Sequence, residues 1–82
     1  MKRADILLAL QKLIGDLLGI SENEIHENST FQELELESID IPTLMVEIER
    51  EFQLDEIDDE DMQEMRTVRC IVDYLEVMLR DA

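Results

Sequence analysis

Apolar side chains recur at steps of three and four residues in three separate stretches of this chain, the spacing that places them on one face of an α-helix. The three sets, in chain order, are Ile6, Leu7, Leu10, Ile14 and Leu17; Ile41, Leu44, Met45, Ile48 and Phe52; and Val68, Ile71, Val72, Leu75 and Leu79. Helices with one apolar face must bury those faces against one another. The spacing therefore predicts an all-α protein.

The first helix is expected from about Lys2 to Leu18. Gly19 follows its last apolar residue and suits a left-handed C-terminal cap, while Gly15 weakens the helix and indicates close packing. The polar segment from Ser21 to Glu33 is interpreted as a loop with one helical turn. Its length allows the first two long helices to run in the same direction.

A second helix is expected from about Asp40 to Phe52, and Pro42 limits where it begins. Proline lacks an N–H group, and in a helix its ring clashes with the carbonyl four residues earlier, here that of Ser38. We therefore expect Asp40 to be the N-cap, Pro42 to lie in the first turn and Ser38 to stay in the preceding loop. The solvent face of this helix is expected to hold Glu47, Glu49, Arg50 and Glu51.

A short third helix of one to two turns is expected after Asp58 or Asp59, either of which can cap it. Thr67 is expected to cap the fourth helix. A chain of 82 residues is too short to support two hydrophobic cores. We therefore predict one domain, a small four-helix bundle of three long helices and one short helix.

Ser38 is a candidate functional residue because it lies beside a helix N-terminus. Unpaired backbone N–H groups and the positive end of the helix dipole favour a phosphate at such a place. Nucleophilic catalysis is disfavoured, since the residues from Leu36 to Asp40 supply neither a basic histidine nor a glycine-flanked turn. The sequence therefore favours an attachment or binding site over an enzyme.

The residues around Ser38 follow an ordered pattern, in which a Phe, acidic residues and leucines precede the serine and a helix ending in acidic residues and Phe follows it. They are Phe31, Glu33, Leu34, Glu35, Leu36, Glu37, Ser38, Ile39, Glu49, Glu51 and Phe52, with Gly19-Ile20, Ile57 to Glu60, Thr67-Val68 and Asp73-Tyr74 as further marks. This pattern resembles the acyl carrier proteins and the related peptidyl carrier domains. Glu35 replaces the usual Gly, Glu37 the usual Asp, and Pro42 falls where a long helix normally opens.

In that family the serine is esterified with 4'-phosphopantetheine from coenzyme A, and the terminal thiol carries an acyl group. The resemblance implies that residues 1–82 are a single carrier domain, acyl-carrier-protein-like in fold, modified at Ser38 and not itself an enzyme. It implies a phosphopantetheinyl transferase and acyl-transferring or acyl-modifying enzymes of fatty-acid, polyketide or related biosynthesis as partners. The residues expected to meet their basic docking surfaces are Glu37, Ile39, Asp40, Val46, Glu47, Glu51 and Glu60.

A function of another class stays open, namely an acidic helical protein-interaction module of the same fold that is not modified. Glu35 and Pro42 keep that alternative open, and a hydrolase is less favoured than either. The methionines also have two interpretations. Met45, Met62 and Met65 are ordinary core residues, or they part to admit an acyl chain between the second and third helices.

The charge of the chain excludes several classes of partner. With 22 acidic and 7 basic residues, its formal net charge of -15 repels the phosphates of nucleic acids and of anionic lipids. Arg50 is the only basic residue between Glu33 and Glu64, so the region around Ser38 is the most acidic part of the chain. We therefore expect no nucleic-acid binding, salt-sensitive docking to basic protein surfaces, and a monomer.

Other features exclude metal sites and membrane segments. The single cysteine, Cys70, forms neither an internal disulfide nor a cysteine metal cluster, and His26 is the only histidine. Residues 55–61 lack the ligand spacing and the glycine of an EF-hand loop. The apolar run from Ile6 to Leu10 is too short for a signal-peptide core or a membrane span. We expect a cytoplasmic protein that binds no metal and does not insert into membranes.

Overall fold

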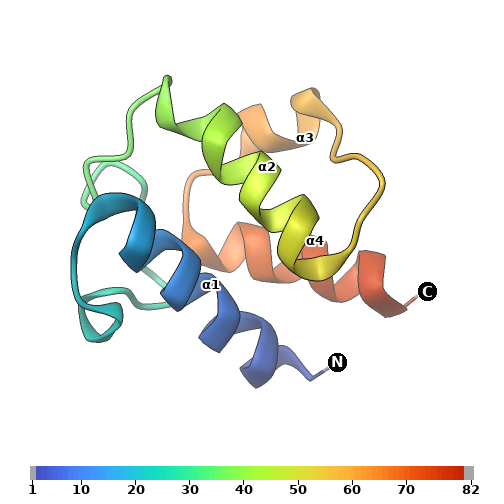
Figure 1. Ribbon diagram of the computed structural model, residues 1–82, viewed down its shortest axis with the longest axis horizontal. Coiled ribbons are helices and arrows are strands. Elements are labelled where there is room, and N and C mark those ends of the chain that lie inside the picture. Colours follow the sequence, from blue (N-terminus) through green and yellow to red (C-terminus); the bar gives the residue numbers. More distant parts are fainter. Residues whose placement is uncertain (1, 81–82) are drawn as a thin grey trace.

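The computed structural model describes residues 2–80, and over that range the chain folds into a bundle of α-helices (Figure 1). The elements are α1 (Arg3–Leu18), the 3-10 turn η1 (Glu22–Glu24), α2 (Asp40–Phe52), α3 (Asp59–Glu64) and α4 (Val68–Arg80). The predicted bundle of three long helices and one short helix is confirmed. None of the helices in the described range is both long and apolar enough to span a bilayer.

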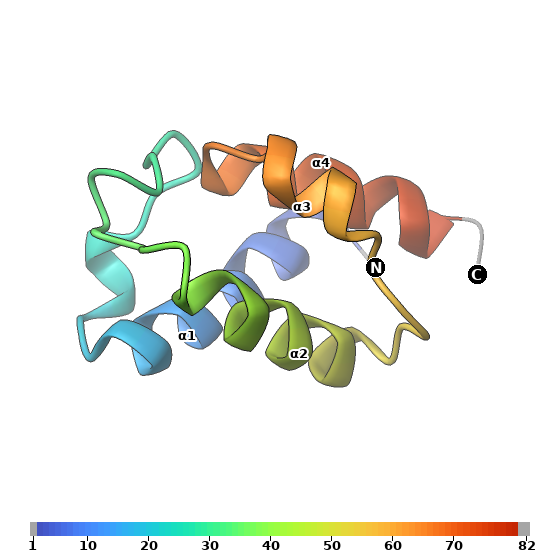
Figure 2. The ribbon, with the colours of Figure 1, turned by 90° about the horizontal axis from the view of Figure 1, so that it is seen from above.

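The helix α1 runs in the opposite direction to α2 and α4, as Figures 1 and 2 show. The expectation that the first two long helices run in the same direction is therefore wrong. The connection between them stays at one end of the bundle because backbone hydrogen bonds tie it to the start of α4. The Phe31 N–H donates to the carbonyl oxygen of Arg66 at 2.9 Å, and the Val68 N–H donates to that of Ser29 at 3.0 Å.

The predicted apolar faces meet in one core. Its helical members are Ile6, Leu10, Ile14, Leu44, Ile48, Phe52, Met62, Val68, Ile71, Val72 and Leu75. Ile25, Phe31 and Ile57 are buried with them although they lie in connecting segments. Since burial of a large apolar side chain contributes about 1.5–3 kcal/mol, these three residues fasten the loops to the core.

Both glycines lie where the backbone requires them. Gly19 adopts φ 70° as the C-cap of α1, and its N–H donates to the carbonyl oxygen of Gly15. A Cβ added at Gly15 would lie 3.0 Å from the carbonyl oxygen of Ile20, so a larger residue would push against the chain that folds back over the helix end. The predicted cap and the predicted close packing are confirmed.

Side-chain caps set the starts of α3 and α4 as predicted. Asp58 Oδ1 accepts a hydrogen bond from the Glu60 N–H at 2.9 Å. Thr67 Oγ1 accepts one from the Cys70 N–H at 3.3 Å. Each contact satisfies a backbone N–H that has no partner inside the helix.

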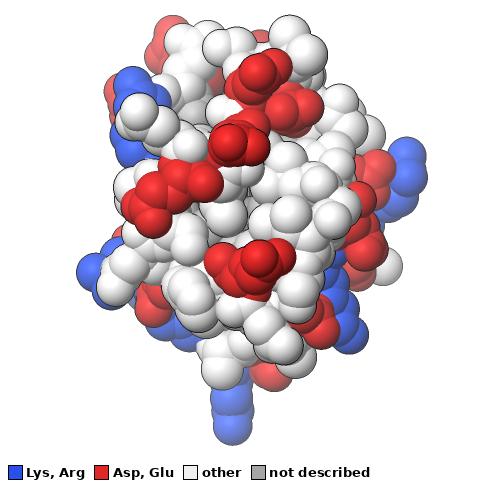
Figure 3. Space-filling view, turned by 90° about the vertical axis from the view of Figure 1, so that its left-hand side faces the viewer, with Lys and Arg blue, Asp and Glu red and all other residues white. Residues whose placement is uncertain are grey.

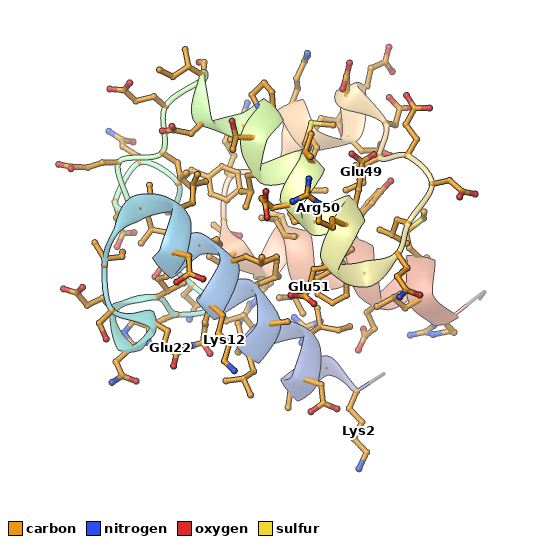
Figure 4. All side chains as sticks on the ribbon, in the orientation of Figure 1. Lys2, Lys12, Glu22, Glu49, Arg50 and Glu51 are labelled. Atoms are coloured by element: carbon orange, nitrogen blue, oxygen red, sulfur yellow. The ribbon has the colours of Figure 1, made fainter. Side chains whose placement is uncertain are left out.

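Glu49 does not lie on the solvent face of α2, contrary to the expectation. It is half-buried, and its Oε2 accepts a hydrogen bond from the Ile57 N–H at 3.0 Å (Figure 4). The chain turns after α2 because Gln53 takes the left-handed conformation at φ 54°. Glu49 therefore holds the connection between α2 and α3 in place.

Candidate functional site

Ser38 lies in the turn that leads into α2 and is exposed. Two hydrogen bonds between Glu37 and Asp40 close this turn. The Asp40 N–H donates to the Glu37 carbonyl oxygen at 2.9 Å, and Asp40 Oδ2 accepts from the Glu37 N–H at 3.0 Å. The turn therefore presents Ser38 to solvent between two carboxylates.

The start of α2 explains why Ser38 stays outside the helix. The helix begins at Asp40, so Pro42 is in its first turn, where a missing N–H is tolerated. The prediction that Ser38 remains in the preceding segment is confirmed. The prediction that Asp40 is the N-cap is wrong: Ile39 occupies that position without a side-chain cap, and the Asp40 carboxylate turns back to Glu37.

A cleft of about 690 Å³ opens beside Ser38, between α2 and α3. Most of its lining side chains are apolar. The lining consists of Phe31, Leu36, Glu37, Ser38, Ile41, Pro42, Met45, Asp59, Met62, Gln63, Met65 and Arg66. Such a lining suits an apolar group attached to, or bound beside, Ser38.

The three methionines fit both interpretations made from the sequence. Met62 and Met65 are buried core residues, and Met45 is half-buried against the same core. All three also line the cleft. Methionine is flexible and adapts to irregular spaces, so the position of these side chains is compatible with either interpretation.

Glu35 has an unusual backbone conformation in the loop before Ser38. Its φ is 61°, in the left-handed region that costs a residue with a Cβ about 1–2 kcal/mol. The loop adopts it because the N–H groups of Glu35 and Leu36 donate to the carbonyl oxygens of Gln32 and Phe31. Because glycine adopts a positive φ without this cost, the conformation explains why the carrier pattern usually has glycine at this position.

The residues expected to meet partner proteins lie in the turn before α2, on α2 and on α3. Ile39 is 77% exposed and Val46 is 50% exposed. Glu37, Glu51 and Glu60 are exposed, while Asp40 and Glu47 are half-buried. Figure 3 shows the end of the bundle at which α2 starts, with carboxylates across it and Lys and Arg only near its margins.

The arginines on α1 and α4 form ion pairs. Arg3 contacts Glu27, and its Nη1 lies 2.6 Å from Asp73 Oδ1 and 3.6 Å from Glu76 Oε1. The hydrogen bonds to Asp73 and Glu27 raise the pKa of the Arg3 guanidinium. Further pairs join Arg69 to Glu27 at 4.0 Å and Arg80 to Glu76 at 3.9 Å.

Arg66 and Leu36 are cleft residues that the sequence-based site omitted. Arg66 is the only basic side chain in the cleft lining. It is also the only basic residue between Arg50 and Thr67. A lone basic residue in such an acidic stretch could have been noticed from the sequence. Its closeness to Ser38 was not visible there, because it depends on the contact between the loop at Phe31 and the segment after α3.

Two other titratable side chains lie on α4, outside the cleft lining. Burial and the neighbouring Asp61 carboxylate of α3 raise the pKa of the Tyr74 phenol. Hydrogen bonds from the Arg66 backbone and the Thr67 side chain lower the pKa of the Cys70 thiol, which is half-buried. Neither group is placed to act on Ser38.

The arrangement is suited to holding a group at Ser38. The ionisable side chains in the cleft lining are Glu37, Asp59 and Arg66. Within residues 2–80, no set of three side chains is arranged to hold a metal ion. An exposed hydroxyl at a helix start, beside an apolar cleft, fits a phosphodiester-linked arm that bears an apolar cargo.

Three comparisons place the chain among known proteins. Residues 9–75 match the family model described as "Phosphopantetheine attachment site". An acyl carrier protein of Rubrobacter xylanophilus is 38% identical over 76 residues, which cover 92% of this chain and 93% of that protein. The fold is similar to the crystal structure of an acyl carrier protein from Thermotoga maritima, with a TM-score of 0.84 and 28% identity, covering 99% of this chain and 94% of that chain.

Proposed function

This chain belongs to the acyl carrier protein family, whose members hold a covalently attached 4'-phosphopantetheine and are carriers rather than enzymes, and we propose that Ser38 is its attachment residue. The observation that carries this proposal is the position of Ser38, an exposed hydroxyl in the turn before α2 on the rim of an apolar cleft. The family match also spans this residue.

Most other hydroxyls are occupied by structural hydrogen bonds. Ser29 is buried, and its Oγ accepts from the His26 N–H at 2.9 Å. Ser21, Thr30 and Thr67 each accept a hydrogen bond from a backbone N–H two or three residues later. Thr43 is exposed but lies within α2 and is absent from the cleft lining. Ser38 is therefore the best supported site.

The cleft would shelter the cargo. When the arm is bound, its thiol supplies the thioester through which an acyl group is carried. The chain contributes the Ser38 oxygen that anchors the arm and the apolar walls that exclude water from the acyl chain. Met45, Met62 and Met65 line that space and adapt to its contents.

The acidic surface would select partners. Proteins of this family work with phosphopantetheinyl transferases and with acyl-handling enzymes. For this chain we assign the docking contacts to Glu37, Asp40, Glu47, Glu51 and Glu60, with Ile39 and Val46 as apolar contacts between them. Exposed carboxylates attract basic surfaces and accelerate encounter, and two exposed apolar side chains add area that a partner can bury.

The proposed role is delivery of acyl groups between enzymes of fatty-acid, polyketide or related biosynthesis. The monomeric state, the cytoplasmic location and the single domain over residues 1–82 stay predictions. Gel filtration with light scattering tests the first of these directly.

Mass spectrometry tests the attachment site. Wild type, Ser38→Ala and Thr43→Ala are incubated with coenzyme A and a phosphopantetheinyl transferase. Wild type and Thr43→Ala should each gain one phosphopantetheinyl group, and Ser38→Ala should gain none while keeping its helical content and melting temperature, because an exposed serine contributes little to packing. If wild type stays unmodified with several transferases, the unmodified interaction module becomes the better description.

A further inference from the structure

Arg66 stands alone among the charged residues of the cleft. The other ionisable side chains in its lining are the carboxylates Glu37 and Asp59. Within residues 2–80, Arg66 forms no ion pair, whereas Arg3, Arg69 and Arg80 do. A cation placed in an otherwise acidic rim, without a carboxylate partner, is suited to an incoming anion.

Backbone hydrogen bonds bring Arg66 close to the segment that carries Ser38. The Phe31 N–H donates to the Arg66 carbonyl oxygen at 2.9 Å, and the Leu36 N–H donates to the Phe31 carbonyl oxygen at 2.9 Å. Leu36 is two residues before Ser38, and both line the cleft. The Arg66 backbone is therefore tied through Phe31 to Leu36 by two successive hydrogen bonds, and Ser38 follows Leu36 by two residues.

The guanidinium keeps donors available. Its Nη1 donates to the carbonyl oxygens of Gln63 and Met65, the second at 3.1 Å. These bonds hold the side chain against the end of α3 and use one of its three nitrogens. An arginine has five N–H donors in a planar fork that matches phosphate oxygens, so Nη2 and Nε can serve a second acceptor.

We propose that Arg66 binds the phosphodiester that joins the arm to Ser38 and so positions the arm along the cleft. This inference rests on attachment at Ser38. The added phosphodiester would place a negative charge beside Glu37 and Asp40, and Arg66 is the one basic side chain in the cleft lining to offset it. Because Arg66 lines the cleft together with Met62 and Met65, this contact would hold the start of the arm at the cleft.

Phosphorus NMR of the loaded protein tests this role without an activity assay. Wild type, Arg66→Gln, Arg66→Lys and Arg50→Gln are loaded with the arm, and their masses are checked. Arg50→Gln is the matched control, because it removes the same charge from α2 at an exposed position outside the cleft lining. The phosphodiester resonance should shift in Arg66→Gln, shift less in Arg66→Lys, and stay at the wild-type position in Arg50→Gln.

Salt supplies a second measurement that needs no variant. Rising ionic strength weakens a partly exposed ion pair, so the wild-type resonance should move toward the position seen in Arg66→Gln. If Arg66→Gln does not fold, the comparison of wild type with Arg66→Lys across the same salt series decides the question. If the wild type and the Arg66 variants have the same phosphodiester resonance at every salt concentration, the role of Arg66 is refuted.

The masses separate the two proposals. A wild type that gains no arm refutes attachment at Ser38 and the role of Arg66 with it. A wild type that is loaded, with a resonance insensitive to both Arg66 substitutions and to salt, refutes only the role of Arg66. A second check is the melting temperature, which loading should lower more in Arg66→Gln than in Arg50→Gln because the added charge is then uncompensated.

Discussion

On the α1 and α4 side of the bundle, arginines lie beside carboxylates, whereas the carboxylates of α2 and α3 have one arginine, Arg50, as an ion-pair partner within residues 2–80. Arg3 joins α1 to Glu27 in the loop and to Asp73 on α4. The pairs of Arg3 and Arg69 therefore connect separate elements, while Arg50 and Arg80 pair within their own helices, with Glu47 at 3.6 Å and with Glu76 at 3.9 Å.

The difference separates two uses of charge. Paired charges between elements support the fold, although exposed pairs contribute modestly. Unpaired carboxylates repel one another and lower stability, but they stay available to basic partners. The acidic surface beside Ser38 thus stays available for the proposed docking of basic partners, and burial of the apolar core offsets the repulsion within it.

The largest effect is expected from reversing a charge on the recognition side. Glu47→Lys should slow arm attachment about tenfold at low salt, and the difference from wild type should shrink as salt rises. The matched control is Glu76→Lys on α4, which breaks pairs with Arg3 and Arg80. It should lower the melting temperature without slowing attachment, as followed by mass spectrometry. Equal slowing by both substitutions would contradict the division into two sides.

Backbone strain provides the next comparison. Glu35 and Gln53 both have positive φ values, and glycine removes the Cβ clash at such positions. Glu35→Gly and Gln53→Gly should each raise the free energy of unfolding by about 1 kcal/mol, which is the strain relieved less the entropy that glycine loses. Only Glu35→Gly also removes a negative charge near Ser38. Urea unfolding measures both gains in stability. If Glu35→Gly stabilises the protein more than Gln53→Gly does, and added salt removes this difference, the extra gain comes from relief of local charge repulsion.

Neutralising single carboxylates should move stability in opposite directions on the two sides. Glu27→Gln removes contacts to Arg3 and Arg69 and should lower the melting temperature by a few degrees. Glu60→Gln, at an exposed position on α3 without an ion-pair partner in residues 2–80, should leave it unchanged or raise it slightly. Differential scanning calorimetry at two salt concentrations measures both. A loss of stability in Glu60→Gln would mean that this carboxylate is a structural contact.

The smallest effect concerns Tyr74 on α4, whose phenol lies near the Asp61 carboxylate of α3. Its pKa is raised in the folded protein by burial and by Asp61, so the unfolded chain releases the phenolic proton first, near pH 10. Stability is therefore fully present below that pH and is lost as pH rises through the folded pKa. Tyr74→Phe should lose less stability than wild type between pH 9 and 11, with Tyr74→Leu as a packing control. Parallel pH profiles for wild type and Tyr74→Phe would show that the phenol does not contribute.

Local sequence patterns were sufficient for most of the fold. The helices follow the three- and four-residue spacing, and the caps at Gly19, Asp58 and Thr67 each involve residues within four positions of one another. Pro42 alone implied that α2 begins after Ser38. These features depend on short-range geometry, which a sequence displays directly. The docking residues, from Glu37 to Glu60, stay a prediction, since exposure alone does not identify a contact.

Contacts between distant parts of the chain decided the rest. The direction of α1 relative to α2 was mispredicted because loop length does not reveal that Ser29 and Phe31 bond to Val68 and Arg66. Glu49 was predicted to lie on the surface because the sequence does not show that the chain turns at Gln53 and brings the Ile57 N–H within hydrogen-bond distance of the Glu49 carboxylate. Arg66 was also missed, because its position in the cleft depends on the hydrogen bond between its carbonyl oxygen and the Phe31 N–H in the loop before α2. Sequence spacing determines which face of a helix is apolar, because that depends only on neighbouring residues. Which remote groups come into contact is decided by how the helices and loops pack in the folded chain.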